Sequence, residues 1–475
     1  MMTDVPQERE SERSMQLHHH TKFHPDQRKR MLGTPVPRLI LTLAIPTIIS
    51  MMITSIYNMA DTYFVSQINT SASGAVGIVF SVMAIIQAVG FTIGMGVGSV
   101  SSRLLGQNHS QQAAEYASSA VVAAIVCGSA LAALGLTFLD RLVWLLGATP
   151  TIYPYALDYA TYILMGAPVM CVAFSLNHLL RWQGKANRSV IGLGTGGILN
   201  MVLDPIFIFG LDMGIGGAGL ATLLSQCVSM CILASFFLLG QSDIKVSPRC
   251  ISRAPRTYLT IFASGMPSFF RQGMSSLSTV SLNFNAGVYG DAAVAAMAIV
   301  TKVFNFLLSA VIGFGQGMQP VVGYNYGAER YDRVKQAALF SIRFCTVILT
   351  TLALLGAVFA PQVIAFFRDD PQVIDIGIRA FRYQCITLPL GAVLVFANML
   401  FQSVGKYWRA SLLAMSRQGL FFIPLVFLLP AKFGLTGLEL TQTCSDLIAF
   451  TISISMLLYY FLKEFRQEEQ RAGRS

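Results

Sequence analysis

Apolar segments that are long enough to cross a lipid bilayer recur along almost the whole chain. A transmembrane helix needs about 20 consecutive, predominantly apolar residues. Of the 475 residues, 54% are hydrophobic and only 12% are charged, whereas a soluble domain usually carries about 25% charged residues. The sequence therefore predicts an all-α polytopic membrane protein with twelve transmembrane helices, at residues 36–65, 76–104, 113–138, 151–182, 187–210, 215–240, 257–288, 295–325, 333–359, 372–403, 408–431 and 436–462.

The two halves of the chain repeat one pattern. Pro267 follows Pro46 by 221 residues, and the same offset pairs other helix-shaping and basic residues without a gap. These pairs are Gly94 with Gly315, Gly96 with Gly317, Gly106 with Gly327, Pro168 with Pro389, Asn177 with Asn398, Lys185 with Lys406, and Arg188 with Arg409. Chance is a poor explanation for so many glycines, prolines and asparagines in one register, so the sequence predicts a duplicated helical scaffold.

Six spans per half determine how the halves are related. After an even number of spans, the second half enters the membrane from the same side as the first. We therefore expect two parallel six-helix bundles related by a pseudo-two-fold axis along the membrane normal. Basic residues gather in the tails, the central linker and alternate loops, while the opposite loops contain few, namely Arg141, Arg368 and Lys432. This bias predicts cytoplasmic termini, and it explains the net charge of +10 without nucleic acid.

The spans divide the chain into five parts. We expect an N-lobe at residues 36–240, a cytoplasmic linker at 241–256 and a C-lobe at 257–462, between mobile cytoplasmic tails at 1–35 and 463–475. The first tail lacks the apolar core of a cleavable signal peptide. Its histidines, His18, His19, His20 and His24, are expected to be solvated, since nothing folded holds them in place for a metal.

The motifs of common enzymes are absent from the sequence. There is no nucleotide-binding G-x-x-x-x-G-K-[ST], no H-E-x-x-H and no G-x-S-x-G. Two stretches, 192–197 and 214–219, satisfy G-x-G-x-x-G, but neither has the surrounding βαβ unit that a dinucleotide site needs. The eight cysteines show no metal-binding or disulfide spacing. We therefore expect neither an enzyme nor a cofactor, and an ion gradient as the energy source.

Two acidic residues lie inside predicted spans of the first half. Asp61 is late in the first span and Asp204 is late in the fifth, both on the outer side. Inserting an ionisable side chain at the centre of a transmembrane helix costs about 2.5–3.5 kcal/mol of free energy, so such a residue is by default a functional candidate. Asn200 shares a helix face with Asp204, and Thr222 of the sixth span adds a hydroxyl. These oxygens suit Na⁺, while the carboxylates alone would serve a proton.

Prolines and a tyrosine accompany these acids. Tyr57 precedes Asp61 by one helical turn, and Pro205 follows Asp204 directly. Because proline has no N–H, Pro205 is expected to free the carbonyl group of Met201 and to bend the fifth span. The structural alternative is that Asp204 only caps or kinks its span and that Asp61 faces the outer water.

The repeat distinguishes residues that recur in both halves from residues that occur in one half only. At the offset of 221, the acidic and amide positions become apolar, since Asp61 maps to Leu282, Asn200 to Phe421, and Asp204 to Leu425. This asymmetry predicts one cation site, in the first half. The predicted spans of the second half contain charges of their own, which are either mutual ion pairs or part of a substrate path: Arg271, Lys302, Arg417, Glu439 and Asp446.

Three segments stand out within the two predicted sets of six spans: IPTIISMMITSIYNMADTYFVS, LRWQGKANRS and LNMVLDPIFIFG…GIGGAGLAT. Together with the two parallel sets of spans, they resemble the multidrug and toxic compound extrusion (MATE) transporters, and most of all the bacterial MepA-like branch. The resemblance covers residues 36–462. It implies a V-shaped pair of bundles in the bacterial plasma (inner) membrane. It also implies a monomer that exports amphipathic, often cationic small molecules by Na⁺ or H⁺ antiport, with the lipid bilayer as its surroundings.

The resemblance also implies roles for particular residues. Asp61, Asn200, Asp204 and Thr222 correspond by motif to the cation site of the family's N-lobe. Tyr57 and Asn177 match residues that line the N-lobe cavity, and Pro46 matches a proline in the first helix. Some relatives bind the cation through acids of the second half, but this chain has Arg271 in the corresponding helix.

Two other functions are compatible with a polytopic membrane protein. A flippase for a lipid-linked precursor, in the same superfamily, would be favoured by two further spans or by a strongly cationic cavity, and the sequence indicates neither. An intramembrane enzyme or a passive channel is disfavoured, because catalytic motifs are absent and two parallel halves suit alternating access better than a symmetric pore.

Overall fold

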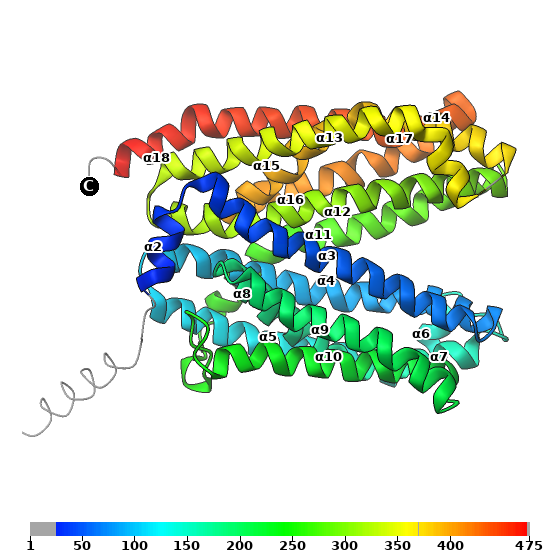
Figure 1. The fold of residues 1–475 in the computed structure, drawn as a ribbon, viewed down its shortest axis with the longest axis horizontal. Coiled ribbons are helices and arrows are strands. Elements are labelled where there is room, and N and C mark those ends of the chain that lie inside the picture. The colour runs from blue at the N-terminus through cyan, green and yellow to red at the C-terminus, as the bar shows by residue number, and fades with distance from the viewer. Residues whose placement is uncertain (1–24, 369, 473–475) are drawn as a thin grey trace, which may run out of the picture.

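The computed structural model describes residues 25–368 and 370–472, except for the side chains of residues 25, 26, 55, 57–59, 62 and 472. The described residues form a bundle of helices arranged in two lobes (Figure 1). The N-lobe comprises α3 (Val36–Ser66), α4 (Thr70–Gly106), α5 (Ser110–Thr137), α6 (Leu139–Leu145), α7 (Tyr153–Met165), α8 (Ala167–Trp182), α9 (Ala186–Pro205), the π-helix η1 (Ile206–Gly210) and α10 (Gly214–Leu238).

The C-lobe follows a linker that contains the short η2 (Pro248–Cys250). Its elements are α11 (Pro255–Gly287), α12 (Asp291–Gly327), α13 (Tyr331–Phe367), α14 (Pro371–Thr387), η3 (Leu388–Leu390), α15 (Gly391–Ser403), α16 (Tyr407–Met415), the π-helix η4 (Ser416–Leu420) and α17 (Phe422–Tyr459). The chain is also helical beyond the two lobes, in α2 (Pro25–Gly33), the π-helix η5 (Tyr460–Glu464) and α18 (Phe465–Ala472).

The helices account for the twelve predicted spans. Within residues 25–368 and 370–472, nine helices are long and apolar enough to cross a bilayer, and the bent pair α7–α8 makes ten. One of the nine, Tyr407–Arg471, contains two spans, because α17 is interrupted at Gly434 by a φ of 58°. The twelfth span is α11, in which Arg271 lies near the middle. The fold class predicted from the sequence is confirmed.

The fourth span of each lobe is broken, although the sequence predicted two continuous helices, 151–182 and 372–403. α7 and α8 meet at Gly166 with a bend of 49°, and α14 is separated from α15 by η3. The breaks fall at the repeat-related prolines Pro168 and Pro389. Since proline offers no N–H to the preceding turn, it loosens the helix at both places.

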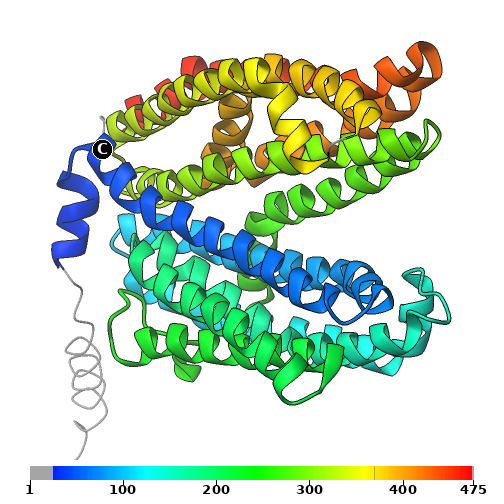
Figure 2. The same cartoon turned by 45° about the vertical axis from the view of Figure 1, so that its right-hand side comes forward.

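Glycines at repeat-related positions bring the two lobes together. A Cβ atom on Gly96 of α4 would lie 2.0 Å from the carbonyl oxygen of Ile261 in α11, and one on Gly317 of α12 would lie 2.6 Å from the Cα atom of Ala44 in α3. Such close backbone contact requires residues without side chains. Figure 2 shows the lobes meeting at the end that holds α2 and α18, and diverging toward the opposite end. We call these the terminal end and the distal end.

Parts of both predicted tails form helices. Residues 25–33, assigned to a mobile tail at 1–35, form α2, and the predicted tail at 463–475 is helical to Ala472. Long-range contacts fix α2, since the side chain of Gln27 donates to the carbonyl oxygen of Gln183 at 2.9 Å and Asn325 donates to that of Met31 at 3.2 Å. The four histidines at positions 18–20 and 24 lie outside the described residues.

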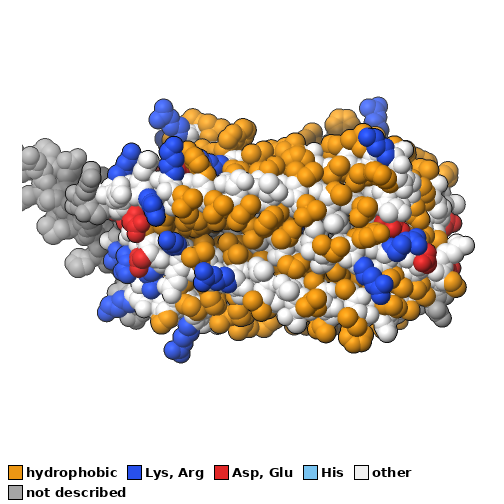
Figure 3. Space-filling view, turned by 90° about the horizontal axis from the view of Figure 1, so that it is seen from above, with side chains coloured by type: hydrophobic (Ala, Val, Ile, Leu, Met, Phe, Trp, Pro, Cys, Tyr) orange, Lys and Arg blue, Asp and Glu red, His pale blue; other side chains and the backbone are white. Residues whose placement is uncertain are grey.

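The surface has the distribution of polarity that a bilayer requires. On the face shown in Figure 3, hydrophobic side chains cover the middle of the molecule, while Lys and Arg side chains gather toward its two ends. Large apolar side chains such as Leu134, Phe138, Val347 and Leu354 are more than half exposed. An apolar belt between two polar ends is typical of a protein that spans a membrane.

Candidate cation site

The fifth and sixth spans place three of the predicted ligands together. Asn200 and Asp204 lie one turn apart on the same face of α9, which packs against α10. The side-chain nitrogen of Asn200 donates to Asp204 Oδ1 at 3.1 Å and to Thr222 Oγ1 of α10 at 3.3 Å. All three side chains are buried, and Asp204 is 0% exposed. One amide thus joins the carboxylate to the hydroxyl.

Asp61 reaches the same site from the first span. α3 packs along α9, and the carboxylates of Asp61 and Asp204 are close enough for their charges to interact. The hydroxyl of Tyr159, in α7, donates to Asp61 Oδ2 at 3.3 Å. Asp61 is only 8% exposed, so it does not face the outer water as the structural alternative required. The four predicted ligands therefore come from three helices that meet in the N-lobe.

Three oxygen atoms of this site are buried without a hydrogen-bond partner. They are Asp61 Oδ1, Asn200 Oδ1 and Asp204 Oδ2. A buried carboxylate oxygen that lacks a partner is unfavourable unless a cation or a proton compensates it. Carboxylate and amide oxygens are suitable ligands for a hard cation such as Na⁺, and the carboxylates alone can hold a proton. Within the described residues, no group of three or more His, Cys, Asp or Glu side chains forms a transition-metal site.

The backbone beside the site departs from the α-helix. α9 ends at Pro205, and the next five residues form the π-helix η1, in which Leu211 N donates to Ile206 O at 2.9 Å. Because Pro205 has no N–H, the Met201 carbonyl loses its ordinary helical donor. Single π-turns of this kind are common at functional sites. The resemblance also implies that Pro46 bends the first span, and this proline lies inside α3, which is helical on both sides of it.

Asn177, which the resemblance places beside the N-lobe cavity, is a buried residue of α8. Its side-chain nitrogen donates to the carbonyl oxygen of Ser189 at 3.0 Å, and its side-chain oxygen accepts from Arg181 at 2.9 Å. In the C-lobe, its repeat mate Asn398 donates in the same way to Ala410, at 2.5 Å. A hydrogen bond present in both lobes belongs to the scaffold. The side chain of Tyr57, the other predicted cavity residue, lies outside the described side chains.

Among its described residues, the C-lobe holds no counterpart of the Asp61–Asp204 pair. Leu282, at the position that matches Asp61, is a buried apolar residue. The two buried acids of the C-lobe each pair with an arginine instead, although Glu439 Oε2 is also buried without a partner. Asp446 accepts from Arg417 at 2.8 Å, and Glu439 accepts from Arg379 at 3.1 Å. Among the described residues, Arg271 and Lys302 form no ion pair. Of the C-lobe charges named from the sequence, Arg417 thus pairs with Asp446 and Glu439 pairs with Arg379, while Arg271 and Lys302 have no carboxylate partner among the described residues.

Sequence reasoning missed Tyr159. The hydroxyl of this residue approaches Asp61 only because α7 packs against α4 and α10, which a single sequence does not reveal. One signal was nevertheless present. At the offset of 221, Tyr159 maps to Ala380, so this tyrosine is absent from the copy, as the acids are.

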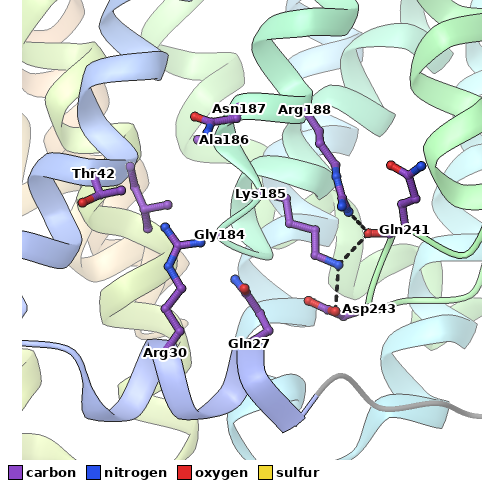
Figure 4. Close-up of a pocket in the computed structure, with 11 residues that line it drawn as sticks. Gln27, Arg30, Thr42, Gly184, Lys185, Ala186, Asn187, Arg188, Gln241 and Asp243 are labelled. Atoms are coloured by element: carbon purple, nitrogen blue, oxygen red, sulfur yellow. Dashed lines mark hydrogen bonds and ion pairs between the residues drawn. The ribbon is translucent and has the colours of Figure 1, made fainter.

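A separate polar cavity of about 300 Å³ opens at the terminal end (Figure 4). Lys185 Nζ contacts Asp243 Oδ1 and the carbonyl oxygen of Gln241, both at 2.7 Å, and the guanidinium of Arg188 also donates to Gln241. Burial lowers the pKa of Lys185, and Asp243 opposes this change. Because Lys185 and Asp204 lie at opposite ends of α9, about 28 Å apart at 1.5 Å per residue, this cavity is distinct from the cation site.

Comparison with known proteins identifies the family of this chain. The MatE family model matches residues 46–206 and 267–428, and thus more than half of the chain. A FAD transporter of Shewanella oneidensis is 28% identical over 426 residues, which cover 89% of this chain and 94% of that protein. The multidrug export protein MepA of Staphylococcus haemolyticus is 26% identical over 430 residues, with 90% and 94% covered.

Solved structures agree with these matches. The crystal structure of a MATE transporter in the bent conformation has a TM-score of 0.88 and 25% identity, and covers 93% of this chain and 99% of that one. The two segments that match the family model begin at Pro46 and Pro267, the residues that first revealed the repeat. This chain belongs to the MatE family of membrane transporters.

Proposed function

We propose that this protein exports small molecules by antiport with Na⁺ or H⁺, and that Asp61, Asn200, Asp204 and Thr222 bind the coupling cation. The observation that carries this proposal is the set of three buried oxygen atoms without partners, supplied by α3 and α9. A cation or proton that binds there offsets the negative charge of two neighbouring carboxylates. The driving force is sufficient, since each charge that crosses the membrane contributes about 2.3 kcal/mol per 100 mV.

The arrangement of the lobes supports alternating access. Close backbone contacts through Gly96 and Gly317 hold the lobes together at the terminal end, and the lobes diverge at the distal end (Figure 2). The basic residues of the linker and tails favour a cytoplasmic terminal end in the bacterial plasma membrane. The structure then corresponds to a state that is closed toward the cytoplasm. Cation binding in the N-lobe would act on α3, which contacts α12 of the other lobe.

The relatives do not agree on one substrate. One is named a FAD transporter, and the other a multidrug export protein. The resemblance to the MepA-like branch implied amphipathic, often cationic compounds. Small molecules are the shared class, and the chemistry of the substrate has to be inferred from the side chains of this chain.

The test uses purified protein in proteoliposomes, with Na⁺ and H⁺ gradients imposed separately and no ATP. Transport of a fluorescent cationic dye against its gradient is expected with at least one of the two ions. Dye movement that requires ATP, or that only follows the dye's own gradient, would contradict antiport. Asp212→Asn is a suitable control, because Asp212 is exposed, close in sequence to the site, and has a φ of 53° that asparagine readily adopts.

A further inference from the structure

Three basic side chains lie together where the N-lobe meets the C-lobe. His178 and Arg181 are on α8, and Arg271 is on α11. α4 lies beside both helices, since a Cβ atom on Gly94 would lie 2.9 Å from His178 Cδ2 and one on Gly265 would lie 1.8 Å from the carbonyl oxygen of Thr92. We call His178, Arg181 and Arg271 the basic cluster.

The members of the basic cluster are close enough to influence each other. The charges of Arg181 and Arg271 both act on the imidazole of His178, which packs edge-to-face against Phe91 at a centroid distance of 4.9 Å. Arg181 also crosses between the lobes, because its guanidinium donates to Gln316 Oε1 of α12. The basic cluster therefore lies at the contact between the lobes and not on the lipid-facing surface.

No carboxylate neutralises the basic cluster. Arg181 is 3% exposed and donates to two neutral oxygens, those of Asn177 and Gln316, while its Nε has no partner. Both imidazole nitrogens of His178 and the Nη1 atom of Arg271 are likewise buried without a partner. In the part of the chain that the structure describes, no ion pair includes any of the three.

Uncompensated buried cations are unfavourable for folding. Two other arginines of the molecule have partners for their charged groups. Arg417 is paired with Asp446 at 2.8 Å, and the buried Arg333 donates to neutral oxygens of Asn325, Met31 and Thr34. Guanidinium groups kept within a membrane without a carboxylate are candidates for substrate binding. An anion that enters between the lobes would supply the missing partner.

The duplicated scaffold shows that folding does not require these charges. At the offset of 221, Arg181 maps to Gln402, His178 maps to Met399, and Arg271 maps back to Ser50. The neutral Gln402 makes the contacts of its position without a charge, since its amide donates to the Ser268 hydroxyl at 3.2 Å and accepts from Gln319 at 3.1 Å. The basic cluster, like the acids of the cation site, is confined to one copy.

We propose that the basic cluster binds an oxyanion, a phosphate or carboxylate group, on the exported substrate. This inference rests on the proposed export function, and it adds compounds that carry an anionic group to the amphipathic cations that the resemblance implied. Guanidinium groups suit such a ligand, because their planar arrays of N–H donors match the oxygens of phosphate and carboxylate. Anion binding at Arg181 would also compete with its contact to Gln316, and would link substrate binding to the contact between the lobes.

The test measures equilibrium binding to the full-length chain in detergent, by fluorescence, for riboflavin and riboflavin 5′-phosphate. The two probes differ by one phosphate group. We expect the phosphate ester to bind at least tenfold more tightly, with an affinity that falls as salt is added. Equal affinities for the two probes, or no binding of the ester, would overturn the proposal.

Substitution of Arg271 tests whether the phosphate ester binds at the basic cluster. Among the described residues, Arg271→Gln removes a charge without breaking a hydrogen bond or ion pair, and it should reduce the affinity for the phosphate ester at least tenfold. Arg271→Lys should retain most of it. Arg343→Gln is the matched control, because Arg343 is an exposed arginine on α13, and it should bind as the unchanged protein does. Equal loss in both glutamine variants would contradict a site at the basic cluster.

Two further measurements separate the proposals. Ion-driven export of a cationic dye without binding of the phosphate ester would overturn the oxyanion site and leave antiport standing. Binding of the phosphate ester without ion-driven transport would overturn antiport and leave the oxyanion site standing. Competition in the same micelles with undecaprenyl phosphate distinguishes the sources of the phosphate, since strong displacement indicates a lipid-linked ligand and weak displacement a water-soluble one. Both results require an oxyanion site.

Discussion

The N-lobe and the C-lobe share a scaffold and differ in their buried polar groups. Gly96 and Gly317 make equivalent contacts between the lobes, and Asn177 and Asn398 make equivalent hydrogen bonds. The acids of the cation site have no such mates, since Leu282 occupies the position that matches Asp61. The duplicated residues therefore build helices and their contacts, whereas the unduplicated ones are available for ion and substrate chemistry.

The two lobes also use buried acids differently. In the N-lobe, Asp61 and Asp204 each keep an oxygen without a partner, and no basic side chain pairs with them in the described residues. In the C-lobe, Asp446 accepts from Arg417 and Gln442, both at 2.8 Å. Glu439 keeps one oxygen without a partner but is paired with Arg379 at 3.1 Å. An unpaired acid can exchange a cation or proton at little structural cost, while a paired acid stabilises the fold.

The largest expected effect is a loss of export when the unpaired acids of the N-lobe are substituted. Asp61→Asn and Asp204→Asn should each reduce ion-driven export to background in proteoliposomes, because each removes half of the carboxylate charge that binds the cation. Thermal unfolding should occur at an unchanged or higher temperature, since an uncompensated buried charge is lost. Asp212→Asn should retain full export. Loss of folded protein in the two site variants would indicate a structural role for these acids.

A glycine at the lobe contact should produce the next largest effect. Gly96→Ala places a Cβ atom 2.0 Å from a backbone oxygen of α11, so the terminal end cannot close. We expect export to fall severalfold, with greater labelling of a cysteine introduced at Ser264 on α11. The matched control is Gly77→Ala on the same helix, where a Cβ meets nothing within 4 Å. Equal activity of the two variants would contradict closure through these contacts.

Breaking an ion pair of the C-lobe should affect stability and not coupling. Asp446→Asn leaves Arg417 without its carboxylate, so we expect a loss of about 1–3 kcal/mol of stability, measured by thermal unfolding in detergent. Export should remain dependent on the same ion. Arg417→Gln combined with Asp446→Asn should recover part of the stability, because neither charge is then left alone. A change of coupling ion in Asp446→Asn would place a second cation site in the C-lobe.

The smallest effect concerns two ion pairs, one in each lobe, that occupy repeat-related positions. Lys185 pairs with Asp243 at 2.7 Å, and their repeat mates Lys406 and Glu464 pair at 2.5 Å. These pairs lie at the terminal end, and their side chains are 7–22% exposed, so Asp243→Asn and Glu464→Gln should each lower stability by about 1 kcal/mol. Thermal unfolding should show the larger shift for Glu464→Gln, because Glu464 also pairs with Arg409 at 2.5 Å. A shift in one lobe alone would show that this duplicated pair is not equivalent in the two copies.

The sequence was sufficient to predict the scaffold and to name the two acids of the candidate cation site. Helix-shaping residues recur at a fixed offset, so the repeat, the number of spans and their pairing are visible in one chain. Asp61 and Asp204 stood out because ionisable residues are rare in apolar spans. Their convergence on one site could only be hypothesised, since it depends on the packing of α3 against α9.

What the sequence did not reveal depends on contacts between distant segments. Tyr159 reaches Asp61 across 98 positions of the chain, and α2 is held by Gln27, which contacts a residue 156 positions away. The basic cluster was missed for the same reason, because its members come from two lobes and His178 and Arg181 resemble ordinary residues near the end of a span. Polar residues in a predicted tail gave no indication of an ordered helix.

The central claim, that the single coupling site lies in the N-lobe, is tested most directly by counting the coupling ions bound. Binding of ²²Na⁺, and proton release on addition of substrate, can be measured on the unchanged protein, on the double variant Asp61→Asn with Asp204→Asn, and on Asp446→Asn. We predict that the unchanged protein and Asp446→Asn bind the ion or release the proton to the same extent, and that the double variant does neither. Undiminished ion binding and ion-driven export in the double variant would contradict the assignment of this site.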